Sequence, residues 1–176
     1  MTLRTPRPLR LGALIAVSAL ALTACAGTPA PAPASAQADA FSSSDVWVKA
    51  ADEGMSAGFG TLANTGDTDL TVVSATDDAT SSMQLHETMQ NESGQMVMRE
   101  IEGGFVIPAG GSLELAPGGN HLMFMDVTTP LRAGDETTIT LTFADDSTAR
   151  IVAPIKEFSG ANETYEGDMG DMDMGQ

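Results

Sequence analysis

Residues 86–125 read HETMQNESGQMVMREIEGGFVIPAGGSLELAPGGNHLMFM, and this stretch decides the fold. It alternates short apolar runs with clusters of Gly, Pro and Asn, which favour turns. The runs expected to form strands here are 83–88, 95–101, 105–107, 112–115 and 121–127. No segment of comparable length shows a sustained helical period. Many short strands separated by turn signals predict an all-β domain, either a β-sandwich or a barrel.

The same pattern of strands and turns continues on both sides of this stretch. Further strands are expected at 46–50, 55–63, 69–75, 137–143 and 148–152. We therefore predict one folded domain over residues 45–158. Residues 25–44 are rich in Pro and Ala, which predicts an extended, disordered tether. Residues 159–176 are acidic and rich in Gly, which predicts a disordered tail.

The first 24 residues have the layout of an export signal. Three arginines precede an apolar run over residues 11–24, which is too short for a comfortable membrane span. The run ends in Leu-Thr-Ala-Cys at residues 22–25, which resembles the bacterial lipobox, so we predict a signal peptide over 1–24 and lipid attachment at Cys25. The alternative is a generic signal peptide with a chance cysteine. The lipobox interpretation predicts an extracytoplasmic lipoprotein anchored to the cell membrane.

The composition argues against several classes of function. With 24 acidic and 8 basic residues, the chain has a formal net charge of −16, which argues against nucleic acid as a partner of the folded domain. Cys25 is the only cysteine, so a lipidated chain has no thiol for a disulfide, a nucleophile or a metal ligand. Without a free thiol there is no cysteine nucleophile, and we expect the protein not to be an enzyme.

Both histidines of the chain lie close to methionines. In the expected strand that begins at His121, residues two apart share a face, so Met123 and Met125 point the same way as His121. Leu122 and Phe124 point the other way and are the natural core residues. The opposite face then presents one imidazole and thioethers together, a set of ligands suited to a soft metal ion such as Cu(I).

The neighbouring strands leave alternatives open. Met96 and Met98 share a face with Glu100, but alternation does not decide which face of that strand is buried. His86 lies on the face opposite Leu85. If Leu85 packs inward, we expect His86 to project outward or to lie at the rim.

Methionines elsewhere in the chain have a simpler interpretation. A single methionine in a strand is usually core filler, and we expect that role for Met55, Met83 and Met125. The acidic tail has no core to fill, so its methionines indicate either weak capture of Cu(I) or chance composition. These tail residues are Met169, Met172 and Met174.

The order and spacing of these residues resemble the PCuAC family of extracytoplasmic copper chaperones. The signature of that family is a His, then a Met, then a His-x-Met pair, and His86, Met98, His121 and Met123 fit it in this order. An early Trp strand, a Met-x-Met-Arg segment and a Pro-Gly-Gly-Asn-His run also match. Each of these elements is weak by itself, but together and in this order they are specific.

The resemblance implies a cupredoxin-like, Greek-key β-sandwich that binds one Cu(I) through these four residues. It further implies delivery of the ion for cytochrome c oxidase assembly, either at the CuA site or through a thiol-bearing assembly factor. It leaves open whether Met96 or Met89 contributes to the site. Two other functions remain possible: a copper-sequestering protein of the cell envelope, and a structural or protein-binding lipoprotein without a metal.

Overall fold

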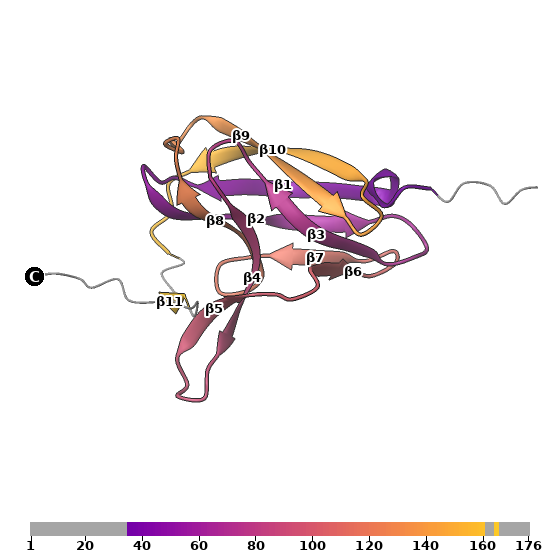
Figure 1. Cartoon of the computed structure of the whole chain (residues 1–176), viewed down its shortest axis with the longest axis horizontal. Coiled ribbons are helices and arrows are strands. Elements are labelled where there is room, and N and C mark those ends of the chain that lie inside the picture. Colours follow the sequence, from indigo (N-terminus) through magenta and orange to yellow (C-terminus); the bar gives the residue numbers. More distant parts are fainter. Residues whose placement is uncertain (1–34, 161–163, 166–176) are drawn as a thin grey trace, which may run out of the picture. The chain divides into compact units, whose positions relative to one another are not determined.

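The computed structural model describes residues 35–160 and 164–165, and within them the fold is all-β, as predicted (Figure 1). A short 3-10 helix, η1 (Gln37–Ala40), precedes the first strand. The strands are β1 (Phe41–Lys49), β2 (Gly54–Asn64), β3 (Leu70–Thr76), β4 (Met83–Gln90), β5 (Met96–Glu100), β6 (Phe105–Ile107), β7 (Ser112–Leu115), β8 (His121–Val127), β9 (Glu136–Phe143), β10 (Thr148–Lys156) and β11 (Thr164–Tyr165). No helix in this part of the chain is long and apolar enough to cross a membrane.

Several expectations from the sequence concern residues outside the described ranges. The signal peptide over 1–24 and the lipid attachment at Cys25 both lie there. The tail methionines Met169, Met172 and Met174 lie there as well. These expectations therefore remain predictions.

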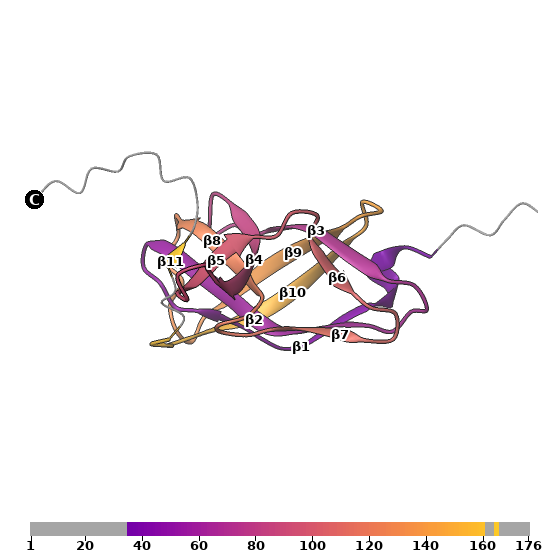
Figure 2. The same cartoon turned by 90° about the horizontal axis from the view of Figure 1, so that it is seen from below.

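Hydrogen bonds join the strands in one continuous path, β11-β5-β4-β8-β2-β1-β10-β9-β3-β6, with β7 paired to β2. Between β1 and β10 the pairing is parallel and short, and joins only Val48 to Ile155 and Lys49 to Lys156. The strands from β5 to β1 form one layer, and those from β10 to β6 form the other. Figure 2 shows β3 across the domain from β1 and β7. These two layers form the predicted β-sandwich.

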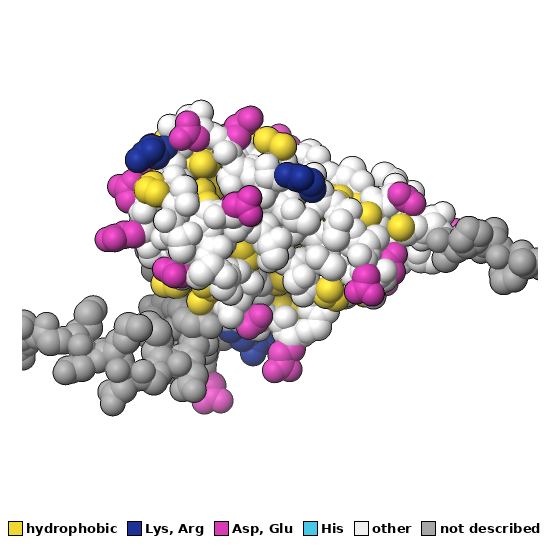
Figure 3. Space-filling model, turned by 45° about the horizontal axis from the view of Figure 1, so that its top comes forward, with side chains coloured by type: hydrophobic (Ala, Val, Ile, Leu, Met, Phe, Trp, Pro, Cys, Tyr) yellow, Lys and Arg dark blue, Asp and Glu magenta, His cyan; other side chains and the backbone are white. Residues whose placement is uncertain are grey.

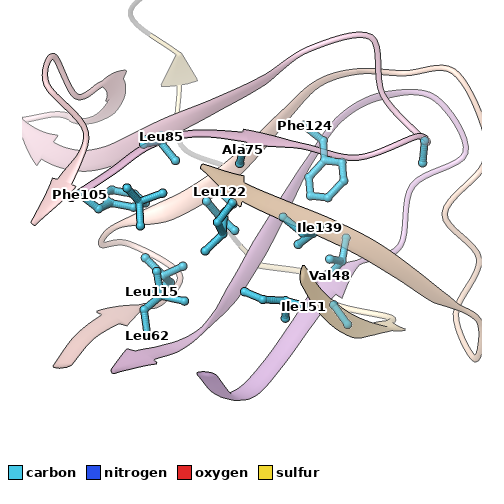
Figure 4. Close-up of a cluster of buried hydrophobic side chains, with 14 of the residues drawn as sticks. Val48, Leu62, Ala75, Leu85, Phe105, Leu115, Leu122, Phe124, Ile139 and Ile151 are labelled. Carbon is cyan, nitrogen blue, oxygen red and sulfur yellow. The ribbon is translucent and has the colours of Figure 1, made fainter. Parts of the chain in front are cut away.

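The hydrophobic core lies between the two layers. Leu122 and Phe124 of β8 point into it, as the alternation predicted, and join Val48 of β1 and Ile139 of β9 (Figure 4). All four side chains are at most 1% exposed. Full burial of such a side chain contributes about 1.5 to 3 kcal/mol. The core therefore holds β8 in place and fixes which of its residues face outward.

Strand β1 begins at Phe41, ahead of the expected domain boundary at residue 45. The ring of Phe41 packs against Phe143 of β9, with ring centroids 5.4 Å apart. The serines that follow pair with β2 through their backbones. The sequence placed residues 41–44 in the tether because serines carry no strand signal. The aromatic anchor and the backbone pairing make them part of the sandwich.

A β-bulge interrupts β1 after its first four residues, since the register with β2 shifts between Ser44 and Trp47. Gly60 of β2 faces this bulge with a φ of 143°. A Cβ atom at Gly60 would lie 2.7 Å from the Cα atom of Val46. Only glycine fits this close approach of two backbones.

The segment after β10 stays on the sandwich. Phe158 packs against Trp47, with ring centroids 5.3 Å apart, and Lys49 Nζ donates a hydrogen bond of 3.0 Å to the carbonyl oxygen of Gly160. Strand β11 then pairs in parallel with β5, whose edge would otherwise present unpaired backbone groups. The expected disordered tail over 159–176 therefore contains a two-residue strand.

Candidate functional site

The two histidines face each other on neighbouring strands. Strands β4 and β8 pair antiparallel, and their register places His86 directly opposite His121. The ring centroids lie 5.4 Å apart, with an angle of 70° between the ring planes. Residues directly opposite in an antiparallel pair share a face, so both imidazoles project to the same side of the sheet.

Two methionines project from the same face. Met98 of β5 lies opposite Thr88, and Met123 of β8 lies opposite Gln84. Thr88 and Gln84 each lie two residues from His86 in β4 and therefore share its face. All four residues that the sequence selected are thus brought together on three adjacent strands, β5, β4 and β8. Figure 1 shows β4 and β5 as a hairpin that extends away from the sandwich.

His86 lies on the face of β4 opposite the core residue Leu85, as expected, but it is 0% exposed and therefore does not reach the surface or the rim. Its neighbour Leu85 is also buried, and both faces of β4 are therefore covered at this point. On the outer face, the ring of Phe59 lies 6.2 Å from that of His121, and Trp47 packs on Phe59 at 4.8 Å. Alternation shows which residues share a face, but it does not reveal this second, aromatic layer of packing.

The hydrogen bonds of the two rings indicate which nitrogen carries the hydrogen in each neutral imidazole. Nδ1 of His121 lies 3.0 Å from the carbonyl oxygen of Gly119, which can only accept, so Nδ1 carries the hydrogen. Nε2 of His86 lies 2.8 Å from Oε1 of Gln84 and donates to it. The lone pairs of neutral rings then lie on Nε2 of His121 and Nδ1 of His86, the atoms through which the rings could bind a metal ion.

Burial of His86 favours the neutral form of its imidazole. Loss of solvent around the ring, and to a lesser extent the nearby His121, lowers the pKa of His86 from 6.5 to about 4. The imidazole of His86 is therefore neutral at pH 7. A neutral ring is the form that binds a metal ion, so no proton has to leave His86 before binding.

A cavity of about 40 Å³ opens beside Met98, His121 and Met123. Its other lining residues are Lys49, Met55, Ser56, Ala57, Phe59 and Gly118. Sites for organic ligands usually have volumes on the order of 300 Å³ or more, whereas a single water molecule needs only roughly 10 to 15 Å³. The cavity is thus suited to an ion or a water molecule.

The cavity distinguishes between the neighbouring methionines of β5. Met98 is 6% exposed and lines the cavity. Met96 is 47% exposed and is not among the lining residues. Met89 of β4 is partly buried and does not line the cavity either. Of these three methionines, only Met98 lines the cavity.

Met55 is the residue that the sequence interpretation missed. It was expected in the core, but it is 46% exposed and lines the cavity. A useful signal was available, because strict alternation puts Met55 on the same face as Ala57 and Phe59. Met83 packs against the core as expected, while Met125 is half-buried outside the core cluster.

The donor atoms of this group are of a particular kind. Within the described part of the chain, no three His, Cys, Asp or Glu side chains come together as a possible metal site. The group offers imidazole nitrogens and thioether sulfurs instead. Thioethers select Cu(I), whereas zinc sites use thiolates, imidazoles and carboxylates, and Ca²⁺ and Mg²⁺ prefer oxygen ligands. The donor set therefore fits a soft univalent ion.

Solved structures with a similar fold include DR1885 from Deinococcus radiodurans in two forms. The apo solution structure has a TM-score of 0.53 and 29% sequence identity, and the match covers 84% of this chain and 97% of that chain. The CuI form has a TM-score of 0.53 and 28% identity, over 70% of this chain and 84% of that chain. The apo PCuAC domain from PmoF1 has a TM-score of 0.57 and 22% identity, over 68% of this chain and 95% of that chain. The fold is therefore the cupredoxin-like fold of PCuAC domains.

One sequence relative covers nearly the whole chain. "Putative lipoprotein Lxx21020" of Leifsonia xyli subsp. xyli (strain CTCB07) is 48% identical over 166 residues, which are 93% of this chain and 99% of that protein. A family model described as "Putative lipoprotein LpqE-like" matches residues 42–155, which include β2 to β9 in full and most of β1 and β10. Together these matches show that the chain belongs to the LpqE-like lipoprotein family.

Proposed function

We propose that this protein is an extracytoplasmic copper chaperone that binds one Cu(I) through His86, Met98, His121 and Met123. The observation that carries the proposal is the strand register, which sets the only two histidines of the chain face to face beside two thioethers. The similarity to DR1885, whose solution structure was solved in a CuI form, supports the choice of metal.

The same donor set explains how a chaperone could release its ion. Thiolates oxidise readily in an extracytoplasmic compartment, whereas a site of thioethers and imidazoles cannot be lost by disulfide formation. A thiolate acceptor is a softer and stronger ligand for Cu(I), so the ion passes to it downhill in free energy. The proposed acceptor is the CuA-bearing subunit of cytochrome c oxidase or a thiol-bearing assembly factor. A lipid on Cys25 would hold the protein at the membrane.

The surface charge restricts the kind of partner. Asp and Glu side chains are spread over the face drawn in Figure 3, whereas Lys and Arg are few. The whole chain has 24 acidic and 8 basic residues. Such a surface repels phosphate groups, so nucleic acid is not a proposed partner.

A competition titration against a Cu(I) chelator of known affinity tests the proposed site. We expect the purified protein to bind one equivalent of Cu(I) in preference to Zn(II) and Cu(II). The double substitution His121→Ala and Met123→Ala should abolish tight binding, because it removes two of the four donors. Met96→Ala is the matched control, since its side chain is exposed and does not line the cavity. Unchanged stoichiometry and affinity in the double variant would refute the site.

Transfer requires a separate measurement. Cu(I)-loaded protein is mixed with an apo CuA domain, the two proteins are separated, and the copper in each is measured. A chaperone should lose its copper to the CuA domain. If copper binds tightly and does not transfer, the role in oxidase assembly is refuted and sequestration becomes the better explanation.

A further inference from the structure

The mouth of the cavity beside the proposed copper ligands is formed by a methionine that has no assigned role. Three methionines line the cavity: Met55, Met98 and Met123. Met98 and Met123 are 6% and 3% exposed, whereas Met55 is 46% exposed. Of these three thioethers, that of Met55 is therefore the most accessible to an ion that approaches from solvent.

The backbone conformation at the start of β2 sets the direction of the Met55 side chain. Gly54 has a φ of 73°, and the register with β8 shifts between Gly54 and Ser56. Irregularities of this kind often redirect a side chain beside a functional site. The Ser56 hydroxyl donates a hydrogen bond of 2.6 Å to the carbonyl oxygen of Lys49, which fastens the start of β2 to the end of β1. Met55 is thus held on a fixed backbone.

The packing around Met55 leaves its sulfur accessible. Ala57, two residues along, lies opposite Met123, and its small side chain leaves room between the two methionines. Met55 is absent from the core cluster and from the partly buried residues packed against it. Core filling therefore does not explain a large apolar side chain at this position.

Electrostatic attraction does not account for capture of a cation here. Among the residues that the structure describes, no Asp or Glu lines the cavity, and the one charged lining residue is Lys49. The ammonium group of Lys49 donates to the carbonyl oxygen of Gly160. The lining side chains best suited to a soft cation are therefore the thioethers, and Met55 supplies the exposed one.

We propose that Met55 is an outer thioether ligand, which takes Cu(I) at the mouth of the cavity and passes it to the buried donors. This inference rests on the proposed function. In the exchange, the bond from copper to the Met55 sulfur breaks as a bond forms to Met98, Met123 or a histidine nitrogen. The copper stays Cu(I), and no proton or electron has to be supplied.

The substitution Met55→Leu tests this role, because leucine keeps the volume and the apolar character of the side chain but removes the sulfur. Met96→Leu is the matched control, since Met96 is equally exposed, at 47%, and lies away from the cavity. We expect Met55→Leu to slow the transfer of Cu(I) to a competing chelator by about tenfold, the lower end of the range for loss of a supporting contact at a metal site. Met96→Leu should leave the rate unchanged.

Oxidation by peroxide gives a second readout that needs no variant. Peroxide transfers one oxygen atom to an exposed thioether and leaves as water, and mass spectrometry measures the sulfoxide at each methionine. Ag⁺ serves as a soft univalent substitute that does not cycle between redox states with peroxide. Saturation with Ag⁺ should protect Met55 from oxidation and should leave Met96 unprotected.

The outcomes separate this inference from the proposed function. If the unsubstituted protein binds no Cu(I), both are overturned. If it binds Cu(I) and the double substitution at His121 and Met123 abolishes binding, the proposed site stands. Equal transfer rates for Met55→Leu and Met96→Leu, together with unprotected Met55 under Ag⁺, would then overturn the role of Met55 alone.

Discussion

The buried histidine makes the stability of the apo protein depend on pH in a defined direction. The pKa of His86 is about 4 in the folded protein and 6.5 as a reference for the unfolded chain. Above pH 6.5 neither state binds the proton, so the full stability is present. Between those two values the unfolded chain binds a proton that the folded protein does not, so the free energy of unfolding falls as the pH falls.

The size of the effect follows from the same two values. Within this window each pH unit removes about 1.4 kcal/mol per proton. Acidification from about pH 7 to about pH 4.5 should therefore cost about 2 kcal/mol through His86 alone. A domain of this kind has a total stability of roughly 5 to 15 kcal/mol, so the loss is large enough to measure.

Urea unfolding at the two pH values provides the assay. Trp47 is the only tryptophan, and its fluorescence reports on the site because the ring packs against Phe59 and Phe158. Many carboxylates also titrate in this range, so the comparison is made with His86→Gln, which does not titrate and can still donate to Gln84. The wild-type protein should lose about 2 kcal/mol more than this variant. Equal losses in the two proteins would refute the reasoning.

Two further predictions concern the sandwich. Leu122→Ala removes a side chain that is 1% exposed and should lower the free energy of unfolding by about 2 to 5 kcal/mol, measured in urea, with unchanged Cu(I) stoichiometry in the titration. A change in stoichiometry would mean that the core face and the outer face of β8 are not independent. Gly60→Ala forces a Cβ atom to within 2.7 Å of the backbone of Val46 and should lower the melting temperature by several degrees, because about 1 to 3 kcal/mol of strain is added. An unchanged melting temperature would show that the bulge yields without strain.

Local signals in the sequence predicted most of the strands. The expected strands at 105–107, 112–115 and 121–127 have the bounds of β6, β7 and β8, because Gly, Pro or Asn clusters precede each of them and follow the first two. The start of β1 was placed too late, because residues 41–44 owe their strand to pairing with β2 and to one aromatic contact. The start of β1 is therefore determined by contacts with residues distant in the sequence, which a local pattern cannot show.

The sequence predicted which residues share one face, but it did not predict how deeply they are buried. Alternation in β8 and the family spacing together selected residues that the structure brings onto one face. The burial of His86 depends on contacts with other strands, among them the ring of His121 in β8, and could not be read from β4 itself. Alternation groups Met55 with Ala57 and Phe59, but only the pairing of β2 with β8 shows that Ala57 lies opposite Met123.

The alternation of β8 also determines which kinds of genetic change the protein tolerates. His121 and Met123 face the cavity, while Leu122 and Phe124 face the core. A substitution at one of these positions alters either stability or the site. Insertion or deletion of a single residue within the strand would exchange the two faces, with an imidazole and thioethers entering the core and the core residues turning outward. Descendants of this gene should therefore vary β8 by substitution and confine changes of length to the turns on either side.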